Sequence, residues 1–194
     1  MTNRRELLKI GLAAAALPVA AQAALLETGV PRVALYKVLY DTRFPASVAF
    51  AQRAVVGGLD VRAMTGDMTP FWYHDLYHRW KQGRVAIAGL TAYGALFCLE
   101  RLAWDQRMRV VYRGEHAPAH GGCVAHRFEG AAELLPSAAD AAASSGWPAA
   151  LADVVAACPS SFAVRRTATA VTADDGMRLS EPLFSWVIAP VARA

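Results

Sequence analysis

The stretch Arg32-Val33-Ala34-Leu35-Tyr36-Lys37-Val38-Leu39-Tyr40 decides the fold of this chain. It is a nearly continuous apolar run with β-branched and aromatic residues, a pattern typical of a buried central strand. Residues 45–56 follow with helical spacing of apolar residues and end at Gly57-Gly58. A buried strand followed by a helix of this length predicts the first half of a βαβ unit.

The same alternation continues to residue 113. We expect further strands at residues 59–64, 85–88 and 109–112, separated by helices at 71–82 and 92–106. This pattern predicts a three-layer α/β fold with a mostly parallel sheet. Asp60 and Arg62 alternate with apolar residues, which places the second strand at an edge. The strand order 2-1-3-4, a flavodoxin-like arrangement, satisfies these constraints.

The second half of the chain has a different pattern. Residues 116–130 are rich in histidine and glycine and lack an apolar period, so we expect a long loop there. Residues 131–157 are alanine-rich and predict helix, interrupted at 144–148. Strand patterns at 162–171 and 183–189 flank the turn Asp174-Asp175-Gly176 and predict a C-terminal antiparallel hairpin at one sheet edge. Residues 24–194 are therefore expected to form a single α/β domain.

The N-terminus carries a targeting pattern. Arg4 and Arg5 precede a mild apolar stretch at residues 10–20, which ends in the small-residue site Ala21-Gln22-Ala23. This resembles a twin-arginine export signal, which implies recognition by the Tat translocase, export of the folded protein to the periplasm and cleavage near Ala23. An ordinary secretion signal is the alternative. The run is too short for a stable membrane anchor.

Composition narrows the range of partners. The formal net charge is +4, and the proposed signal carries three basic residues and one acidic residue, so the mature chain would carry +2. Arg165-Arg166 is the longest basic run left in it. Nucleic acid is therefore not an expected partner.

A ligand site is predicted at the carboxyl ends of the strands, where open α/β sheets bind ligands. Arg43 and Arg113 suit the recognition of an anion. Thr69, which precedes Pro70, and Thr91 are favoured as helix N-caps, and Asp41 and Arg43 also fit a mutual ion pair or a cap of the first helix. The candidate ligand-binding residues are Asp41, Arg43, Asp67, Thr69, Thr91, Arg113 and His116.

Cofactor signals are weak. No glycine-rich loop follows the first strand, so no dinucleotide or flavin cofactor is recognisable. A transition metal is a further hypothesis, with His116, His120, Cys123 and His126 as ligands. A polar loop that closes over the crevice is the favoured alternative. Cys98 is expected in the core, and Cys123–Cys158 is the disulfide expected if any pair forms.

These observations favour an exported periplasmic protein that binds a small ligand or serves as an accessory protein of an exported redox system. A co-exported protein partner would account for export in the folded state. The alternative is a small acid–base enzyme using Asp41, Asp67 and His116, or a metal-dependent one, with its site at the same sheet edge.

Overall fold

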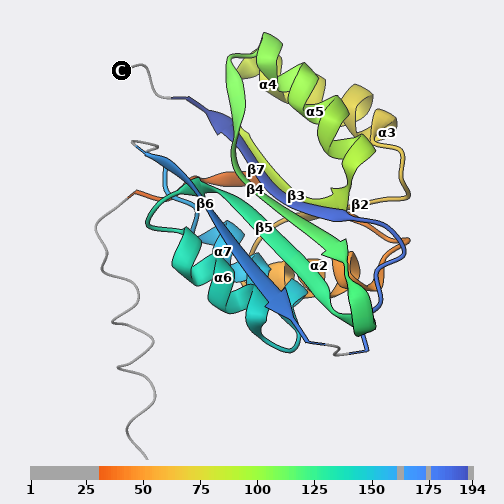
Figure 1. Ribbon diagram of the computed structural model, residues 1–194. Helices are drawn as coiled ribbons and strands as arrows, with labels where there is room; N and C mark the ends of the chain where they lie inside the picture. Colours follow the sequence, from red (N-terminus) through yellow and green to blue (C-terminus); the bar gives the residue numbers. More distant parts are fainter. Residues whose placement is uncertain (1–30, 161–163, 174–175, 192–194) are drawn as a thin grey trace, which may run out of the picture. The chain divides into compact units, whose positions relative to one another are not determined.

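The computed structural model describes residues 31–160, 164–173 and 176–191, which form a seven-stranded mixed sheet with helices on both faces (Figure 1). From one edge to the other, the strands are β2 (Val61–Met64), β1 (Leu35–Asp41), β3 (Ala86–Ala92), β7 (Leu183–Pro190), β4 (Met108–Pro118), β5 (Val124–Ala131) and β6 (Arg165–Thr172). The α/β class predicted from the sequence is confirmed.

The first third of the chain builds the parallel part of the sheet. β1 pairs in parallel with β2 on one side and with β3 on the other. Helix α2 (Pro45–Val56) connects β1 to β2 across one face. The segment α3 (Thr69–Phe71), η1 (Trp72–Leu76, a π-helical turn) and α4 (Tyr77–Gln82) connects β2 to β3 across the other. The predicted order 2-1-3 and the edge position of β2 are therefore found.

The remaining strand pairs are antiparallel, so the predicted mostly parallel, flavodoxin-like sheet of order 2-1-3-4 is wrong. β7 lies between β3 and β4, and β6 pairs with β5 at the far edge, so the predicted C-terminal hairpin is wrong as well. The physical reason lies in β7 itself, because Trp186, Val187 and Ile188 are fully buried. A strand that buries large side chains on both faces needs neighbours and helices on every side, which a sheet edge does not provide.

The predicted loop at residues 116–130 is also wrong. This region is the hairpin of β4 and β5, joined through a short 3₁₀ turn, η2 (His120–Gly122). The inward-facing positions of this hairpin are occupied by glycine and histidine as well as by apolar residues. Buried and exposed residues therefore alternate along both strands, but the buried positions include polar residues and glycine, so the alternation is not apparent from a hydrophobicity pattern.

The helices form two layers (Figure 1). Helices α2, α6 (Leu135–Ala143) and α7 (Trp147–Ala156) cover one face, over a core that includes Phe50 and Trp147. The segment from α3 to α4 and helix α5 (Tyr93–Asp105) cover the other, over a core that includes Leu96 and Trp186. Helix α5 does not extend over β6, whose side chains Thr167, Thr169 and Val171 are exposed on that face. We call this exposed side of β5 and β6 the open face.

The cysteines differ from expectation. Cys98, Cys123 and Cys158 are free thiols, so the Cys123–Cys158 disulfide is not formed. Cys158 is buried, whereas Cys98 is exposed on α5, so its predicted core position is wrong. The reason is the register of the helix: Ala95, Leu96 and Leu99 face the sheet and turn Cys98 outward.

The predicted signal segment, with Arg4, Arg5 and the cleavage site near Ala23, lies outside the described residues. Among the residues that are described, no helix combines the length and the hydropathy needed to cross a bilayer.

Gly89 tests the packing where β1, β3 and β7 meet. A Cβ atom there would lie 2.6 Å from the Leu39 carbonyl oxygen and 2.8 Å from Cζ2 of Trp186. We expect Gly89→Ala to lower the free energy of unfolding by about 1–3 kcal/mol, the usual cost of overpacking. The control is Gly94→Ala on α5, where nothing lies within 4 Å of the added atom. It should be neutral or stabilising by up to about 1 kcal/mol. Equal stability of the two variants in urea denaturation would contradict this packing.

Candidate functional site

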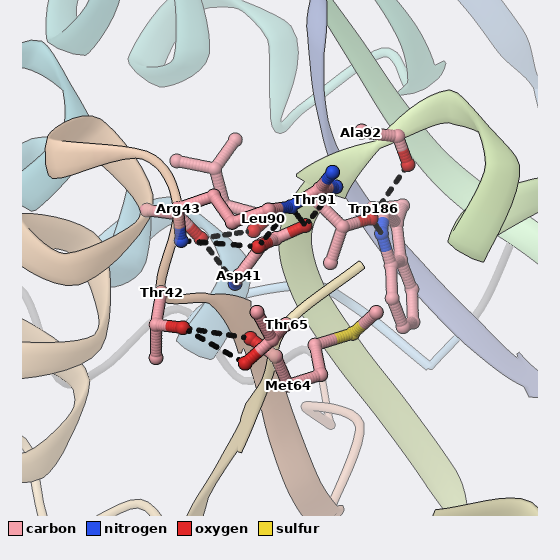
Figure 2. Close-up of polar contacts among 10 residues, drawn as sticks. Asp41, Thr42, Arg43, Met64, Thr65, Leu90, Thr91, Ala92 and Trp186 are labelled. Carbon is pink, nitrogen blue, oxygen red and sulfur yellow. Dashed lines mark hydrogen bonds and ion pairs between the residues drawn. The ribbon is translucent and has the colours of Figure 1, made fainter. Parts of the chain in front are cut away.

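An ion pair between a buried carboxylate and a partly exposed guanidinium lies at the carboxyl end of β1 (Figure 2). Asp41 is fully buried, and its Oδ1 accepts hydrogen bonds from the backbone N and Nε of Arg43 at 3.1 and 3.0 Å. Its Oδ2 accepts a bond from Arg43 Nη2 at 2.7 Å. These bonds raise the pKa of the Arg43 guanidinium further above its already high value. The guanidinium lies against Gly66, where a Cβ atom would stand 2.8 Å from Arg43 Cζ. Arg43 is thus already engaged by a carboxylate.

The Ser47 hydroxyl ties Asp41 to β3, and the nearby Thr91 hydroxyl bonds to β7. The Asp41 backbone N donates to Ser47 Oγ at 2.8 Å, and the Ser47 hydroxyl donates to the carbonyl of Leu90 on β3. Buried Thr91 accepts a hydrogen bond from Trp186 Nε1 at 3.1 Å and donates to the Ala92 carbonyl (Figure 2). Thr91 therefore satisfies an indole of β7. Its alternative role as a helix cap is wrong, because α5 begins at Tyr93.

The hydrogen bonding at the start of α3, in the loop after β2, differs from the prediction. Asp67 Oδ1 accepts a hydrogen bond from the backbone N of Thr69 at 2.8 Å. Hydrogen bonds with Thr69 lower the pKa of Asp67. Thr69 is the first residue of α3 and makes no side-chain cap bond, and Met68 occupies the N-cap position, so the predicted N-cap role of Thr69 is wrong. Asp67 and Thr69 are both exposed.

The insertion of β7 separates the remaining predicted ligand residues from this edge. Arg113 and His116 lie on β4 and project from opposite faces of the sheet. Arg113 Nη2 donates to Glu100 Oε2 of α5 at 2.7 Å, whereas His116 is buried on the side of α6 and α7. The structure thus brings together Asp41, Arg43 and Thr91. Asp67 and Thr69 lie on the adjacent loop, and Arg113 and His116 lie elsewhere.

His116 belongs to a buried hydrogen-bonded chain that crosses four strands. His116 Nε2 lies 2.9 Å from Ser185 Oγ, and its Nδ1 lies 2.8 Å from His126 Nδ1. His126 Nε2 lies 2.7 Å from Thr172 Oγ1, and Tyr112 Oη lies 3.2 Å from Ser185 Oγ. We call Tyr112, Ser185, His116, His126 and Thr172 the histidine ladder. It runs from β7 through β4 and β5 to β6, and all its members are buried.

The last contact of the ladder favours one assignment of its protons. The Thr172 hydroxyl donates to the Ala142 carbonyl, which can only accept. With neutral rings, His126 then donates to Thr172 from Nε2 and accepts at Nδ1 from Nδ1–H of His116. His116 Nε2 in turn accepts from the Ser185 hydroxyl, which accepts from Tyr112. In this arrangement the two neutral rings have opposite tautomers.

The Ser185–His116 contact resembles that of an activated serine nucleophile, but the surrounding packing leaves no room for a substrate. Ser185 is fully buried, and a Cβ atom at Gly114 would lie 2.5 Å from Ser185 Oγ. Trp147 packs on both imidazoles, with ring centroids 4.7 Å from His116 and 4.9 Å from His126. The ladder instead fixes the strand register, because a slip of one residue would turn both histidines toward the opposite face of the sheet.

The predicted metal ligands are spread over this hairpin. His116 and His126 are hydrogen-bonded to each other, while His120 in η2 is exposed and Cys123 is half-buried. Within the described ranges, no group of three or more His, Cys, Asp or Glu residues is placed to hold a metal ion. The transition-metal site stays a prediction, and metal analysis of the purified protein tests it.

A second feature lies on the outer surface of α5. Tyr93, Phe97 and Trp104 are 51, 42 and 44 % exposed and recur with Arg101 at helical spacing on one side of the helix. Tyr93 contacts Phe97 and Phe184, with ring centroids 5.9 and 5.3 Å apart. Arg101 stacks between Phe97 and Trp104, with its Cζ 5.3 and 4.4 Å from the ring centroids. We call Tyr93, Phe97, Arg101 and Trp104 the α5 stripe.

A shallow groove of about 250 Å³ adjoins the stripe at the open face. Cross-strand pairing sets Arg113 opposite Glu129 and Glu115 opposite Arg127. Tyr93 of the stripe forms part of the groove wall, so the two features are continuous. The groove is lined by Tyr93, Arg113, Glu115, Arg127, Glu129 and Phe184.

Sequence reasoning missed Ser185, Thr172 and Tyr112 as partners of the histidines, and it missed the α5 stripe. The signal for the ladder is the period-2 spacing of Tyr112, Gly114 and His116. The signal for the stripe is the spacing of Tyr93, Phe97 and Trp104, which becomes informative once the opposite side of the helix is known to be buried.

Comparison with known proteins finds no family model, no curated protein and no solved structure that matches this chain.

Removal of Arg43 tests whether the ion pair is structural. Arg43→Ala leaves the Asp41 carboxylate buried with much of its hydrogen bonding lost, and we expect a loss of about 1–3 kcal/mol of stability. The control is Arg53→Ala, because the Arg53–Asp153 pair is exposed on both sides. Its loss should change stability much less than the loss of Arg43, because exposed ion pairs contribute little. Thermal unfolding measures both variants, and equal effects would contradict a structural role for Arg43.

The histidine ladder predicts acid sensitivity. Burial, with His126 nearby, lowers the pKa of His116 well below 6.5. Below pH 6.5 the unfolded chain therefore binds a proton that the folded protein does not bind. The free energy of unfolding should then fall as the pH falls, by up to about 1.4 kcal/mol per pH unit from this residue. Urea denaturation between pH 7.5 and 5.5 measures this slope.

Two variants test whether His116 causes the dependence of the free energy of unfolding on pH. His116→Gln should be less stable than the wild type at pH 7.5 and should lose much of the slope. His78→Gln, at an exposed histidine of α4, should leave the slope unchanged. An unaltered slope in His116→Gln would show that another group carries the acid sensitivity.

Proposed function

We propose that the protein is an exported accessory protein that binds a co-exported partner protein through the α5 stripe. The twin-arginine pattern at Arg4 and Arg5 supports export of the folded chain. The observation that carries the proposal is the stripe itself, because three large aromatic side chains are exposed together on one side of a helix whose other side is buried.

The composition of the stripe favours a protein partner. Aromatic residues and arginine are enriched in protein–protein interfaces and dominate their binding energy. Residues 93–104 span about 16 Å of helix, a length that a partner helix or strand can follow. The ring contacts and the stacked guanidinium hold the side chains in place, so their ordering costs little on binding.

The crevice at the end of β1 gives less support to a small-ligand function. Asp41 and Thr91 are fully buried, and Arg43 is held by the Asp41 carboxylate. A ligand carboxylate or phosphate would have to compete with a bidentate ion pair already formed within the protein. A partner at α5 needs no such rearrangement, so the accessory function is the better supported of the two.

A photo-crosslinking amino acid placed at Phe97 tests the proposal in cells that produce the protein naturally. We expect a discrete covalent adduct with one protein, because Phe97 lies at the centre of the stripe. The same amino acid at Tyr73, which is 62 % exposed on η1, is the matched control and should give no such adduct.

Two further substitutions sharpen this test. Trp104→Ala should reduce the yield of the Phe97 adduct at least about tenfold, as expected for an interface hot spot, while the protein remains folded by circular dichroism. Tyr73→Ala should leave the yield unchanged. Absence of an adduct at Phe97, or equal labelling from both sites, would contradict the proposed function.

A further inference from the structure

The charges around the α5 stripe are unevenly distributed. At the Tyr93 end, the groove carries two arginines and two glutamates in opposed cross-strand pairs. At the Trp104 end, Arg101, Arg107 and Arg109 are all exposed, and Asp105 is the exposed acidic residue in the same segment. The surface is therefore balanced in charge at one end and basic at the other.

The arginines at the basic end are arranged around one ring. The Cζ atoms of Arg101 and Arg109 lie 4.4 and 5.8 Å from the centroid of Trp104. Stacking uses the face of a guanidinium and leaves the N–H groups along its edge available for hydrogen bonds. Arg109 Nη1 donates to the Met108 carbonyl, which leaves its other N–H groups for further partners.

Carboxylates within the protein do not neutralise these two arginines. Among the described residues, no ion pair is formed by Arg101 or Arg109, whereas Arg53, Arg113, Arg127 and Arg165 each pair with an aspartate or glutamate. A guanidinium held against an indole with a free edge is well suited to bind an external carboxylate in a bidentate manner. The same contact is strengthened when a partner excludes water from it.

We infer that the partner protein presents an acidic segment to the Trp104 end of the α5 stripe, with its carboxylates on Arg101 and Arg109. This inference rests on the proposed function and adds the chemistry and the orientation of the partner. The charge-balanced groove beside Tyr93 takes the less acidic end of that segment. Arg101 and Arg109 act as the charge-recognising residues, and Phe97 and Trp104 supply the apolar contact.

The test uses the Phe97 photo-crosslink in the full-length protein with charge variants. Arg101→Glu combined with Arg109→Glu should reduce the adduct yield at least about tenfold, because two like-charge contacts replace two attractive ones. Arg101→Lys with Arg109→Lys keeps the charge and should retain much more of the yield. The control for net charge is Arg62→Glu with Arg84→Glu, two exposed arginines outside α5 and β4, and it should leave the yield unchanged.

Mass spectrometry of the adduct provides an independent readout. The partner peptide joined to residue 97 should contain several aspartates or glutamates. An adduct that forms equally well with the double glutamate variant, or whose peptide lacks acidic residues, would overturn the acidic segment and leave the proposed function intact. Complete absence of an adduct would overturn both. Equal losses in the stripe and control charge variants would show that net charge, and not this surface, controls the association.

Discussion

The histidine ladder is the interaction on which the antiparallel half of the sheet depends. Ser185, His116, His126 and Thr172 come from four successive strands, and each hydrogen bond joins one strand to the next. Buried polar groups are costly when unsatisfied, so the ladder penalises any register in which these partners do not meet. Strand β7, which carries Ser185 of the ladder, also carries Trp186. The Trp186 indole donates a hydrogen bond to Thr91 on β3, so the position of β7 is fixed against the parallel half of the sheet as well. One strand thus connects both halves of the sheet.

This arrangement explains which surface remains available. The ladder requires burial on the side of α6 and α7, where Trp147 packs on both imidazoles. None of the described helices covers the other side of β5 and β6, and α5 stands at the boundary of this open face with its aromatic residues outward. The buried histidines hydrogen-bond the strands to one another, whereas the α5 stripe is exposed. This division is why the proposed function rests on recognition of a partner and not on the histidines.

The sequence predicts the βα units well, because apolar runs such as residues 32–40 and the helix at 45–56 follow simple periodicities. The sequence does not predict the position of β7. The pattern of residues 183–190 indicates a strand but not its neighbours, because strand order depends on contacts between residues that are distant in the chain. Sequence prediction also fails at the β4–β5 hairpin, where histidine and glycine occupy inward positions that hydrophobicity does not mark. Of the candidate site, Asp41 and Arg43 lie together, as expected from their separation of two residues in the sequence. Arg113 and His116 do not join them, because their expected position depended on the wrong neighbour for β4.

The most direct test of the ladder is long-range ¹H–¹⁵N spectroscopy of the histidine rings at neutral pH. The account predicts neutral rings for His116 and His126 with opposite tautomers, protonated at Nδ1 in His116 and at Nε2 in His126, with ring protons that exchange slowly. The exposed rings of His74 and His78 provide the fast-exchanging comparison within the same spectrum. Identical tautomers for the two buried rings, or a doubly protonated His116 at neutral pH, would contradict a directed chain of hydrogen bonds across the four strands.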